Sequence, residues 1–494
     1  MVVAIAVIAL VTAVVATLLI VVFRENGLTG HERQRAVSIA SAEGQVDSLV
    51  SRIDHASVSA LTDGTLCGKI PGFTTRVGPD ELTITSSVTY SRYDTATNAQ
   101  VDIPCADVVS GAQKAEMAAV RATATSDPLP NTQPAIRNFE TIINLDLDVS
   151  LNQAIFGNAG VTITNNNTVI NGSGGANDGD VYSNGYVNCR GEIYGSVYAQ
   201  TTVRFENDCD WIAGNVWAVG NVTADANSMT MVGDITSSAG SISLNQLGAQ
   251  ANKVFNGKAW AGGAVTGNVC PSAKCNSSQS LSPPPTAAFP WLTDDGWTDP
   301  VSAGGLGYTE ISFPTCVAQF NDPTSLGYWL KNNGPTLTQP TLIRMPDNCT
   351  VDFTNVNGQV MYLNADVAIF ASGASAPGGT AFNITGRPHF VGTPGDIKNL
   401  YFIQDYQTPV CSRIGINVNN HITAEENIRL LMYTPHTFYS ASGNSEIVGQ
   451  IFAGCVAEIN NVMDLTYSNL PVTGIQNINS MTYSSEIVGK RETS

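Results

Sequence analysis

One short phrase recurs between Gly179 and Leu244, and this repeat narrows the folds that are open to the chain. Each copy opens on a glycine, about sixteen to nineteen residues after the last, at Gly179, Gly195, Gly214 and Gly233. Two residues later every copy has a β-branched residue: Val181, Val197, Val216 and Ile235. Such a phrase is too short for a βαβ unit. It fits one turn of a parallel stack, with short strands and corners where glycine supplies a positive φ.

A fifth copy, GKAWAGGAVTG from Gly257, keeps Ala259, Gly263 and Val265 in phase with the phrase GNVWAVGNVTA. Stacked turns lie about 4.8 Å apart, so equivalent residues form ladders and bury a core that no single turn could bury. We therefore predict a mainly β chain whose body is a β-solenoid, or β-helix. In this register the β-branched residues point inward, and Thr223 points outward.

The first 23 residues contain no charged side chain, and as a helix they would span about 34 Å, enough for a bilayer. This predicts a transmembrane or pilin-type apolar helix over residues 1–23. A cleaved signal peptide is the alternative, but no basic residue precedes the apolar run. Arg24, Arg33 and Arg35 follow the run, and by the positive-inside rule they would favour a cytoplasmic body.

Residues 24–125 read as a small α+β stem. Apolar residues recur at helical spacing from about His31 to Leu61, and residues 81–93 alternate like a strand that residues 99–105 could pair with. The proline-rich segment 126–135 is predicted to be a linker that closes this stem.

The remaining boundaries follow the return of the repeat. Residues 136–269 form the first part of the predicted solenoid, and residues 270–345 form a Pro/Ser-rich insertion with a short helix within 323–333. Residues 346–475 form the second part, and residues 476–494 a C-terminal tail. We interpret this as one solenoid with a large insertion; two stacked solenoids are the alternative.

The central phrases resemble bactofilin-type polymer-forming repeats, and Leu430 to Leu470 is similar to the C-terminal solenoid region of large minor-pilin-like proteins of bacteria. The apolar helix, its amphipathic continuation and the small sheet resemble the pilus-assembly minor pilins. Two features depart from that pattern: no glycine-ending leader precedes the apolar run, and Ile5 stands where major pilins carry Glu. We therefore expect a genomic start upstream of Met1 that encodes a basic leader.

Ten cysteines predict five disulfides and therefore an extracytoplasmic body. We give this indication more weight than the arginines after the apolar run, which would favour a cytoplasmic body. Cys189 and Cys209 stand at nearly equivalent places on adjacent turns, so we expect them to pair. The other expected pairs follow from nearness along the chain: Cys270–Cys275, Cys67–Cys105, Cys316–Cys349 and Cys411–Cys455. The alternative interpretation of CPSAKC as half a zinc site lacks a second ligand pair nearby.

Solenoids also carry polysaccharide-cleaving sites, so carboxylates in this chain are candidate catalytic groups. In RFENDCDW, the alternate residues Glu206, Asp208 and Asp210 could share one strand face, as a glycosidase or a calcium site requires. A solvated loop beside a disulfide is the interpretation we prefer. The stretch GGANDGDVY resembles a calcium-binding repeat but occurs once. The five histidines form no motif, and we predict no catalytic residue, metal or cofactor.

A net charge of −18 and a pI of about 4.5 argue against nucleic-acid binding. We therefore expect a non-catalytic structural or adhesive protein of the cell envelope, a large minor-pilin-like subunit or tip component of a type IV-like pilus. Its expected partners are the membrane, other pilus or envelope subunits through the apolar helix, and a surface glycan. A membrane-tethered β-helix enzyme, a polysaccharide lyase or glycoside hydrolase, is the alternative.

Overall fold

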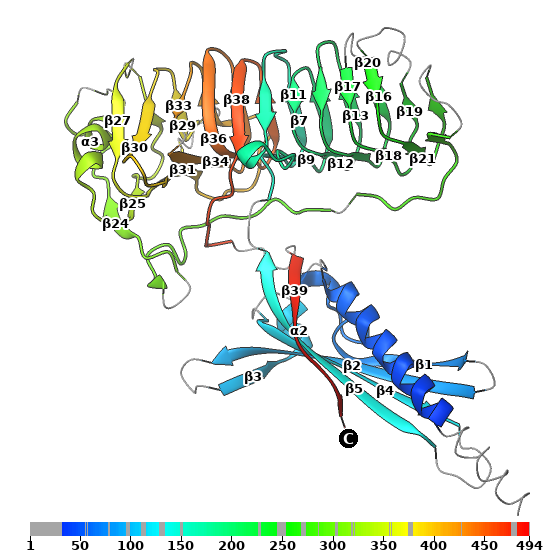
Figure 1. Cartoon of the computed structure of the whole chain (residues 1–494). Helices are drawn as coiled ribbons and strands as arrows, with labels where there is room; N and C mark the ends of the chain where they lie inside the picture. Colours follow the sequence, from blue (N-terminus) through cyan, green and yellow to red (C-terminus); the bar gives the residue numbers. More distant parts are fainter. Residues whose placement is uncertain are drawn as a thin grey trace, which may run out of the picture. The chain divides into compact units, whose positions relative to one another are not determined.

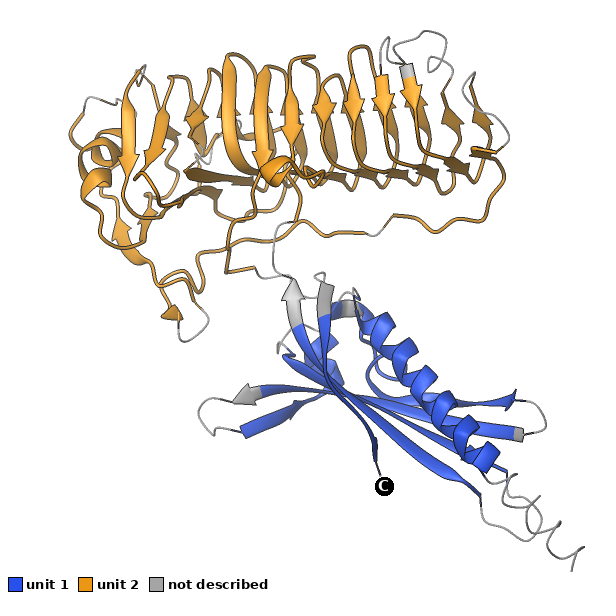
Figure 2. Cartoon of the chain, viewed as in Figure 1, with its two compact units in different colours: residues 1–148, 477–494 blue, residues 149–476 orange. Residues whose placement is uncertain are grey.

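The computed structural model divides the chain into two compact units, residues 1–148 with 477–494, and residues 149–476 (Figure 2). The residues described are 32–54, 56, 58–77, 80–94, 99–109, 115–127, 134–148, 152–225, 229–244, 253–267, 273–284, 286–301, 305–317, 320, 322–354, 356, 358–373, 379–425, 427–475 and 482–493. Within these ranges no helix has both the length and the apolar character needed to cross a bilayer. The predicted membrane helix over residues 1–23 falls outside them and stays a prediction.

Unit 1 is a helix laid across an antiparallel sheet (Figure 1). The helix covers residues 32–53 and buries Ala42, Val46, Leu49 and Ile53, which recur at helical spacing. The sheet has the order β1-β2-β4-β5-β39, with β3 paired to β2. Its strands are β1 (Gly68–Val77), β2 (Asp80–Asp94), β3 (Ala99–Ile103), β4 (Met117–Ser126), β5 (Ile136–Asp148) and β39 (Thr482–Thr493); the short helices η1 (Val58–Ala60) and α2 (Cys105–Val109) complete the unit.

Two predicted boundaries of this unit are wrong. Segment 126–135 does not close it, because β5 follows and pairs with β4 along most of its length. Residues 476–494 are not simply a tail, because β39 pairs with β5 from Thr482 opposite Asp148 to Thr493 opposite Asn138. The pairing joins strands more than 330 residues apart in the sequence, and no local pattern reveals such a partner.

Unit 2 is built from parallel strands, so a mainly β fold with parallel sheets is confirmed. Its first part contains β6 (Ile155–Gly157), β7 (Gly160–Ile163), β8 (Val169–Asn171), η2 (Ser173–Gly175), β9 (Val181–Ser183), β10 (Tyr186–Cys189), β11 (Glu192–Ile193), β12 (Val197–Ala199), β13 (Val203–Phe205), β14 (Trp211–Ile212), β15 (Val216–Ala218), β16 (Val222–Ala224), β17 (Met229–Met231), β18 (Ile235–Ser237), β19 (Ile242–Ser243), β20 (Lys253–Phe255), β21 (Ala259–Ala261), β22 (Val265–Thr266) and β23 (Cys275–Asn276). Each turn gives one strand to an 11-stranded sheet and two strands to a 22-stranded sheet.

The second part of unit 2 continues the same two sheets (Figure 1). It contains β24 (Thr309–Ser312), α3 (Leu326–Asn333), η4 (Gly334–Thr336), β25 (Thr341–Arg344), β26 (Val351–Asp352), β27 (Val360–Leu363), β28 (Val367–Ala371), β29 (Phe382–Ile384), β30 (His389–Gly392), β31 (Lys398–Gln404), β32 (Ile414–Val418), β33 (Thr423–Ala424), β34 (Ile428–Thr434), β35 (Thr437–Ser440), β36 (Asn444–Ala453), β37 (Val456–Ile459) and β38 (Val462–Tyr467). The short helix expected within 323–333 is α3.

The register predicted for the repeat is confirmed. Val197 pairs with Val181 on one side and with Val216 on the other, and Val216 pairs with Ile235. All four side chains are buried, whereas Thr223 is half-buried. The reason given for the glycines is wrong, because none of the four opening glycines has a left-handed φ. A Cβ atom on Gly195 would instead collide with the backbone of Gly179 in the adjacent turn.

The turns do not stack in chain order. The 11-stranded sheet runs from β22 back to β7, then from β37 to β26, so β7 lies beside β37. The chain thus starts in the middle of the stack, winds to one end, crosses to the other end and winds back. Both halves form one continuous stack, and β23, β24 and β25, which fall inside the predicted insertion 270–345, belong to its sheets.

The crossing is made by a segment that we call the return strap, residues 277–308 (Figure 1). It covers outward-facing aromatic residues of the 22-stranded sheet, in which Phe452, Phe156 and Tyr182 stack at 5.6 and 5.3 Å between ring centroids. Side chains of the sheet hold its backbone. The Trp217 indole N–H donates to the Ser282 carbonyl at 3.2 Å, and the Ala287 N–H donates to the Tyr182 hydroxyl at 2.8 Å.

Candidate functional site

The structure joins four of the five expected cysteine pairs. The Cα atoms lie 5.6 Å apart in Cys189–Cys209 and 5.8, 5.4 and 5.1 Å apart in Cys67–Cys105, Cys316–Cys349 and Cys411–Cys455. Cys270 lies outside the described residues, so its pairing with Cys275 stays a prediction. Because disulfides persist in oxidising compartments, the four bridges indicate an extracytoplasmic protein.

Two carboxylates of RFENDCDW, Glu206 and Asp208, lie at the surface in ion pairs with arginines. Arg204 is 3.2 Å from Glu206 and 3.5 Å from Asp225, and Arg190 is 4.0 Å from Asp208. Asp210 accepts the Thr230 N–H through its backbone carbonyl. Each charge of Glu206 and Asp208 is thus next to an arginine.

The other polar candidates from the sequence are also occupied by local contacts. In the stretch GGANDGDVY, Asp178 accepts from the Ser173 N–H at 2.6 Å, and Asp180 accepts from the Ser196 N–H at 2.6 Å. Burial raises the pKa of Asp180. Within the described part of the chain, no cluster of three His, Cys, Asp or Glu side chains could hold a metal ion.

The described histidines are scattered. His389 lies 2.9 Å from Glu425 at the surface, and partial burial lowers the pKa of His421. His436 is 1% exposed, and its Nδ1 accepts the Val410 N–H at 3.1 Å. Burial, with a smaller contribution from Arg413, lowers the pKa of His436. His31 and His55 fall outside the described residues.

A charged cluster that the sequence did not suggest forms at the ends of β25 and β31. Arg344, the last residue of β25, makes ion pairs with Asp294 of the return strap and with Glu310 of β24, the latter at 3.2 Å. Asp405 directly follows β31, which is the next strand but one from β25 in the 22-stranded sheet. Burial raises the pKa of Asp405, and the nearby Arg344 charge partly offsets this rise.

Two aromatic residues adjoin this charged cluster in the sequence, because Trp291 precedes Asp294 by three residues and Tyr406 directly follows Asp405. Trp291 of the return strap stacks on Tyr406 with ring centroids 4.7 Å apart and planes 20° apart. Trp291 is 43% exposed, whereas its neighbour Leu292 is fully buried. Both residues that flank Trp291 are fixed by Tyr433, whose hydroxyl donates to the Pro290 carbonyl at 2.6 Å and accepts the Leu292 N–H at 3.0 Å. We call Trp291, Asp294, Glu310, Arg344, Asp405 and Tyr406 the aromatic corner.

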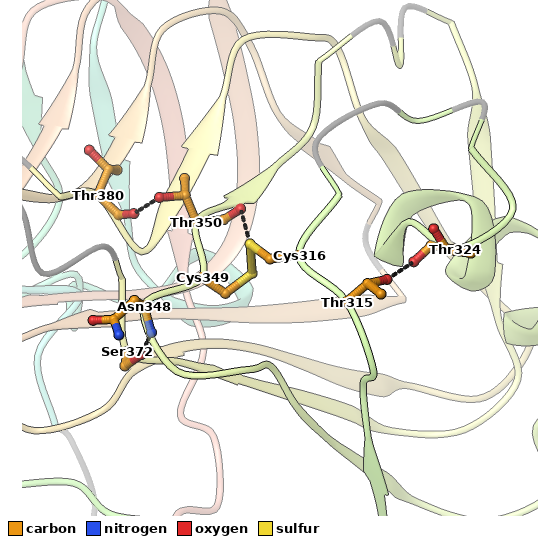
Figure 3. Close-up of a disulfide and its surroundings, with 8 residues drawn as sticks. All are labelled: Thr315, Cys316, Thr324, Asn348, Cys349, Thr350, Ser372 and Thr380. Atoms are coloured by element: carbon orange, nitrogen blue, oxygen red, sulfur yellow. Dashed lines mark hydrogen bonds between the residues drawn. A yellow bond between two sulfur atoms is a disulfide. The ribbon is translucent and has the colours of Figure 1, made fainter.

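Covalent and polar links hold the segments that follow β25 and β28 (Figure 3). The loop that follows Arg344 carries Cys349, which forms the disulfide with Cys316. The N–H of Asn348 donates to the Ser372 hydroxyl at 2.9 Å, and the Gln407 side chain donates to the Ser372 carbonyl at 2.9 Å. Ser372 therefore connects the loop after β25 to the loop after β31.

The corner was missed because its members come from separate segments, near residues 291–294, 310, 344 and 405–406. The one local signal is PWLTDDGW, in which two tryptophans and two aspartates interrupt a proline-rich stretch. From its local sequence, that stretch is predicted to be part of an insertion, and its packing against the stacked strands is not predicted.

Comparison with known proteins gives little support for any particular identity. No family model matches the chain, and no curated protein matches it. A solved structure, the competence-associated pilin ComZ from Thermus thermophilus, aligns over 93% of this chain and 97% of its own, with 11% sequence identity and a TM-score of 0.28. A likeness at this level does not establish a shared fold.

Proposed function

We propose that the chain is a non-catalytic, minor-pilin-like subunit of the cell envelope, in which unit 1 is the assembly domain and unit 2 is a bactofilin-like β-solenoid that it displays. The proposal rests on one observation above all. In the sequence, unit 2 is inserted between β5 and β39, two strands of unit 1 that pair with each other at Asp148 and Thr482. Unit 2 thus interrupts the helix-and-sheet unit between two neighbouring strands.

Other features support the proposal. The helix over residues 32–53 follows the uncharged segment 1–23 in the sequence, as an assembly helix with an apolar start would. The four disulfides suit a body outside the cytoplasm. Only 13% of the residues of the chain are charged, and the expected partners are other envelope subunits and a surface glycan.

The test is to shear surface filaments from cells, purify them and map their peptides by mass spectrometry. We expect the intact chain to copurify with filaments and to be absent from the same fraction of cells that cannot assemble pili. A mature N-terminus near Met1 fits the proposal. Cleavage after Thr17 or near Phe23 would make the protein a secreted one and would refute assembly through segment 1–23.

A β-helix enzyme remains the second candidate function, because the aromatic corner gathers three carboxylates around Arg344. Paired carboxylates next to a bound sugar are the groups that glycosidases use. The purified chain should then release reducing ends or unsaturated products from polysaccharides, and Asp405→Asn should abolish that release. Under our proposal neither product forms.

A further inference from the structure

We propose that the aromatic corner binds an uncharged oligosaccharide, with a sugar ring against Trp291, which Tyr406 supports, and its hydroxyl groups on Arg344 and the neighbouring carboxylates. This inference specifies a ligand for the adhesive role that we propose above. It rests on that proposal in one respect, because it assumes that unit 2 is displayed for contact.

The presentation of Trp291 is the first argument. Trp291 is 43% exposed, and tryptophan is enriched among the residues that dominate binding surfaces. Here Tyr433 fixes the backbone on both sides of Trp291 and Leu292 takes the buried place, so the indole is directed outward. A ring already held in place loses little conformational freedom when a ligand covers it. Tyr406 stacks against one face of the indole and so helps to hold the ring in this orientation.

The charges around the rings decide the class of ligand. A lipid chain would cover the rings but would also desolvate Arg344 and its carboxylates without replacing their hydrogen bonds. A polyanion such as a nucleic acid or a uronate polymer would be repelled, because Asp294, Glu310 and Asp405 outnumber the one arginine.

A pyranose meets both requirements. One face of the ring carries C–H groups, which can cover an indole, and its rim carries hydroxyls. Each hydroxyl can donate to a carboxylate and accept from a guanidinium. The segments that follow Arg344 and Tyr406 are tied by Cys316–Cys349 and by Ser372, which limits their movement before binding.

The test uses the full chain and three probes: cellohexaose, the hexamer of N-acetylglucosamine, and polygalacturonate. All six tryptophans lie in residues 211–329, so their fluorescence reports on unit 2 alone, and calorimetry gives the affinity. We expect saturable binding of at least one neutral hexamer and none of polygalacturonate. Trp291→Ala should weaken binding about tenfold or more, the loss typical of a central aromatic contact.

The matched control is Tyr362→Ala, which removes a 53% exposed tyrosine on β27, a strand outside the corner. This variant should bind within about twofold of the parent, as surface substitutions away from a site usually do. Circular dichroism checks folding, and Trp291→Phe, which keeps an aromatic ring, should retain part of the affinity if Trp291→Ala is misfolded.

Several results would overturn the proposal: no saturable binding of either neutral hexamer, equal losses in Trp291→Ala and Tyr362→Ala, or equal binding of polygalacturonate. Release of new reducing ends would show that the chain cleaves the oligosaccharide and does not only bind it. Failure here is separable from failure of the pilus role. A chain that binds the hexamer but is absent from filaments contradicts only the pilus role, and a filament subunit that binds no hexamer contradicts only this inference.

Discussion

Single side chains in the stacked strands of unit 2 contribute differently to stability, depending on whether they point inward or outward. Val216 lies between Val197 and Ile235 and is 1% exposed, so an acidic group there would be buried without a partner. Thr223 is half-buried on the neighbouring sheet and lies beside Arg204. The two positions are seven residues apart and belong to the same turn.

We expect Val216→Asp to reduce the free energy of unfolding by several kcal/mol, because an unpaired buried charge cannot be offset. Thr223→Asp should change it by less than about 0.5 kcal/mol. Denaturant unfolding followed by tryptophan fluorescence measures both, with the parent chain as reference. Equal destabilisation by the two variants would contradict the register.

His436 predicts a pH dependence of stability. Its pKa in the folded state is lowered from the ordinary value of 6.5, so the unfolded chain takes up a proton more readily. The contribution of neutral His436 is therefore fully present above about pH 6.5 and is lost as the pH falls toward the folded-state value. Unfolding measured between pH 8 and 5 should show this loss, and His436→Gln should flatten it, whereas His389→Gln, at the surface, should not.

Among the elements, β39 is held by charges as well as by backbone pairing. Glu140 of β5 is 3% exposed and lies 2.6 Å from both Arg121 of β4 and Arg491 of β39, which pair with it across the sheet. Lys490 of β39 lies 2.6 Å from Glu43 of the N-terminal helix. The last strand thus connects the sheet to the helix.

Burial alone would raise the pKa of Glu140, but hydrogen bonds and charges from Arg491 and Arg121 outweigh it and lower the pKa. The stabilisation is therefore present above the ordinary value of 4.5 and is lost as pH falls through the lower folded-state value. We expect Glu140→Gln to cost about 1–3 kcal/mol at pH 7, discounted because both arginines are largely exposed. Calorimetry at pH 7 and pH 3 should show a smaller pH effect in the variant.

The elements also show how far sequence alone could lead. The glycine period and the β-branched residues after each glycine determine which strands stack and which side chains turn inward, so these were predictable. Pairing of β7 with β37 and of β5 with β39 depends on strands that neither repeat nor lie near each other in sequence. The aromatic corner depends on that same non-local order, because it brings Trp291 to Tyr406.

At the scale of the whole molecule, the order of turns explains how unit 2 can be inserted at a single point. Strands β6 and β8 lie directly beside β36 and β38, so the first and last turns of unit 2 are neighbours. The connection from β5 into unit 2 and the connection back to β39 therefore start from adjoining turns of the stack.

Replacing residues 149–476 by a short Gly/Ser or Asn-Gly turn should consequently leave unit 1 folded, because β5 and β39 are antiparallel neighbours at Asp148 and Thr482. We expect a cooperative thermal transition by circular dichroism and no tryptophan signal. An unfolded product would show that unit 1 requires unit 2.

The same order of turns determines how long β7 must wait during synthesis for its partner strand β37. Gly160 of β7 emerges from the ribosome almost three hundred residues before its neighbour Val456 of β37. At synthesis rates of about 5–20 residues per second, that interval lasts on the order of 15 to 60 s. Throughout it, the first half of the stack has an open edge at the strands that will later be its centre, and open edges invite pairing with other chains. The half-made stack is therefore most prone to aggregation before its last turns arrive.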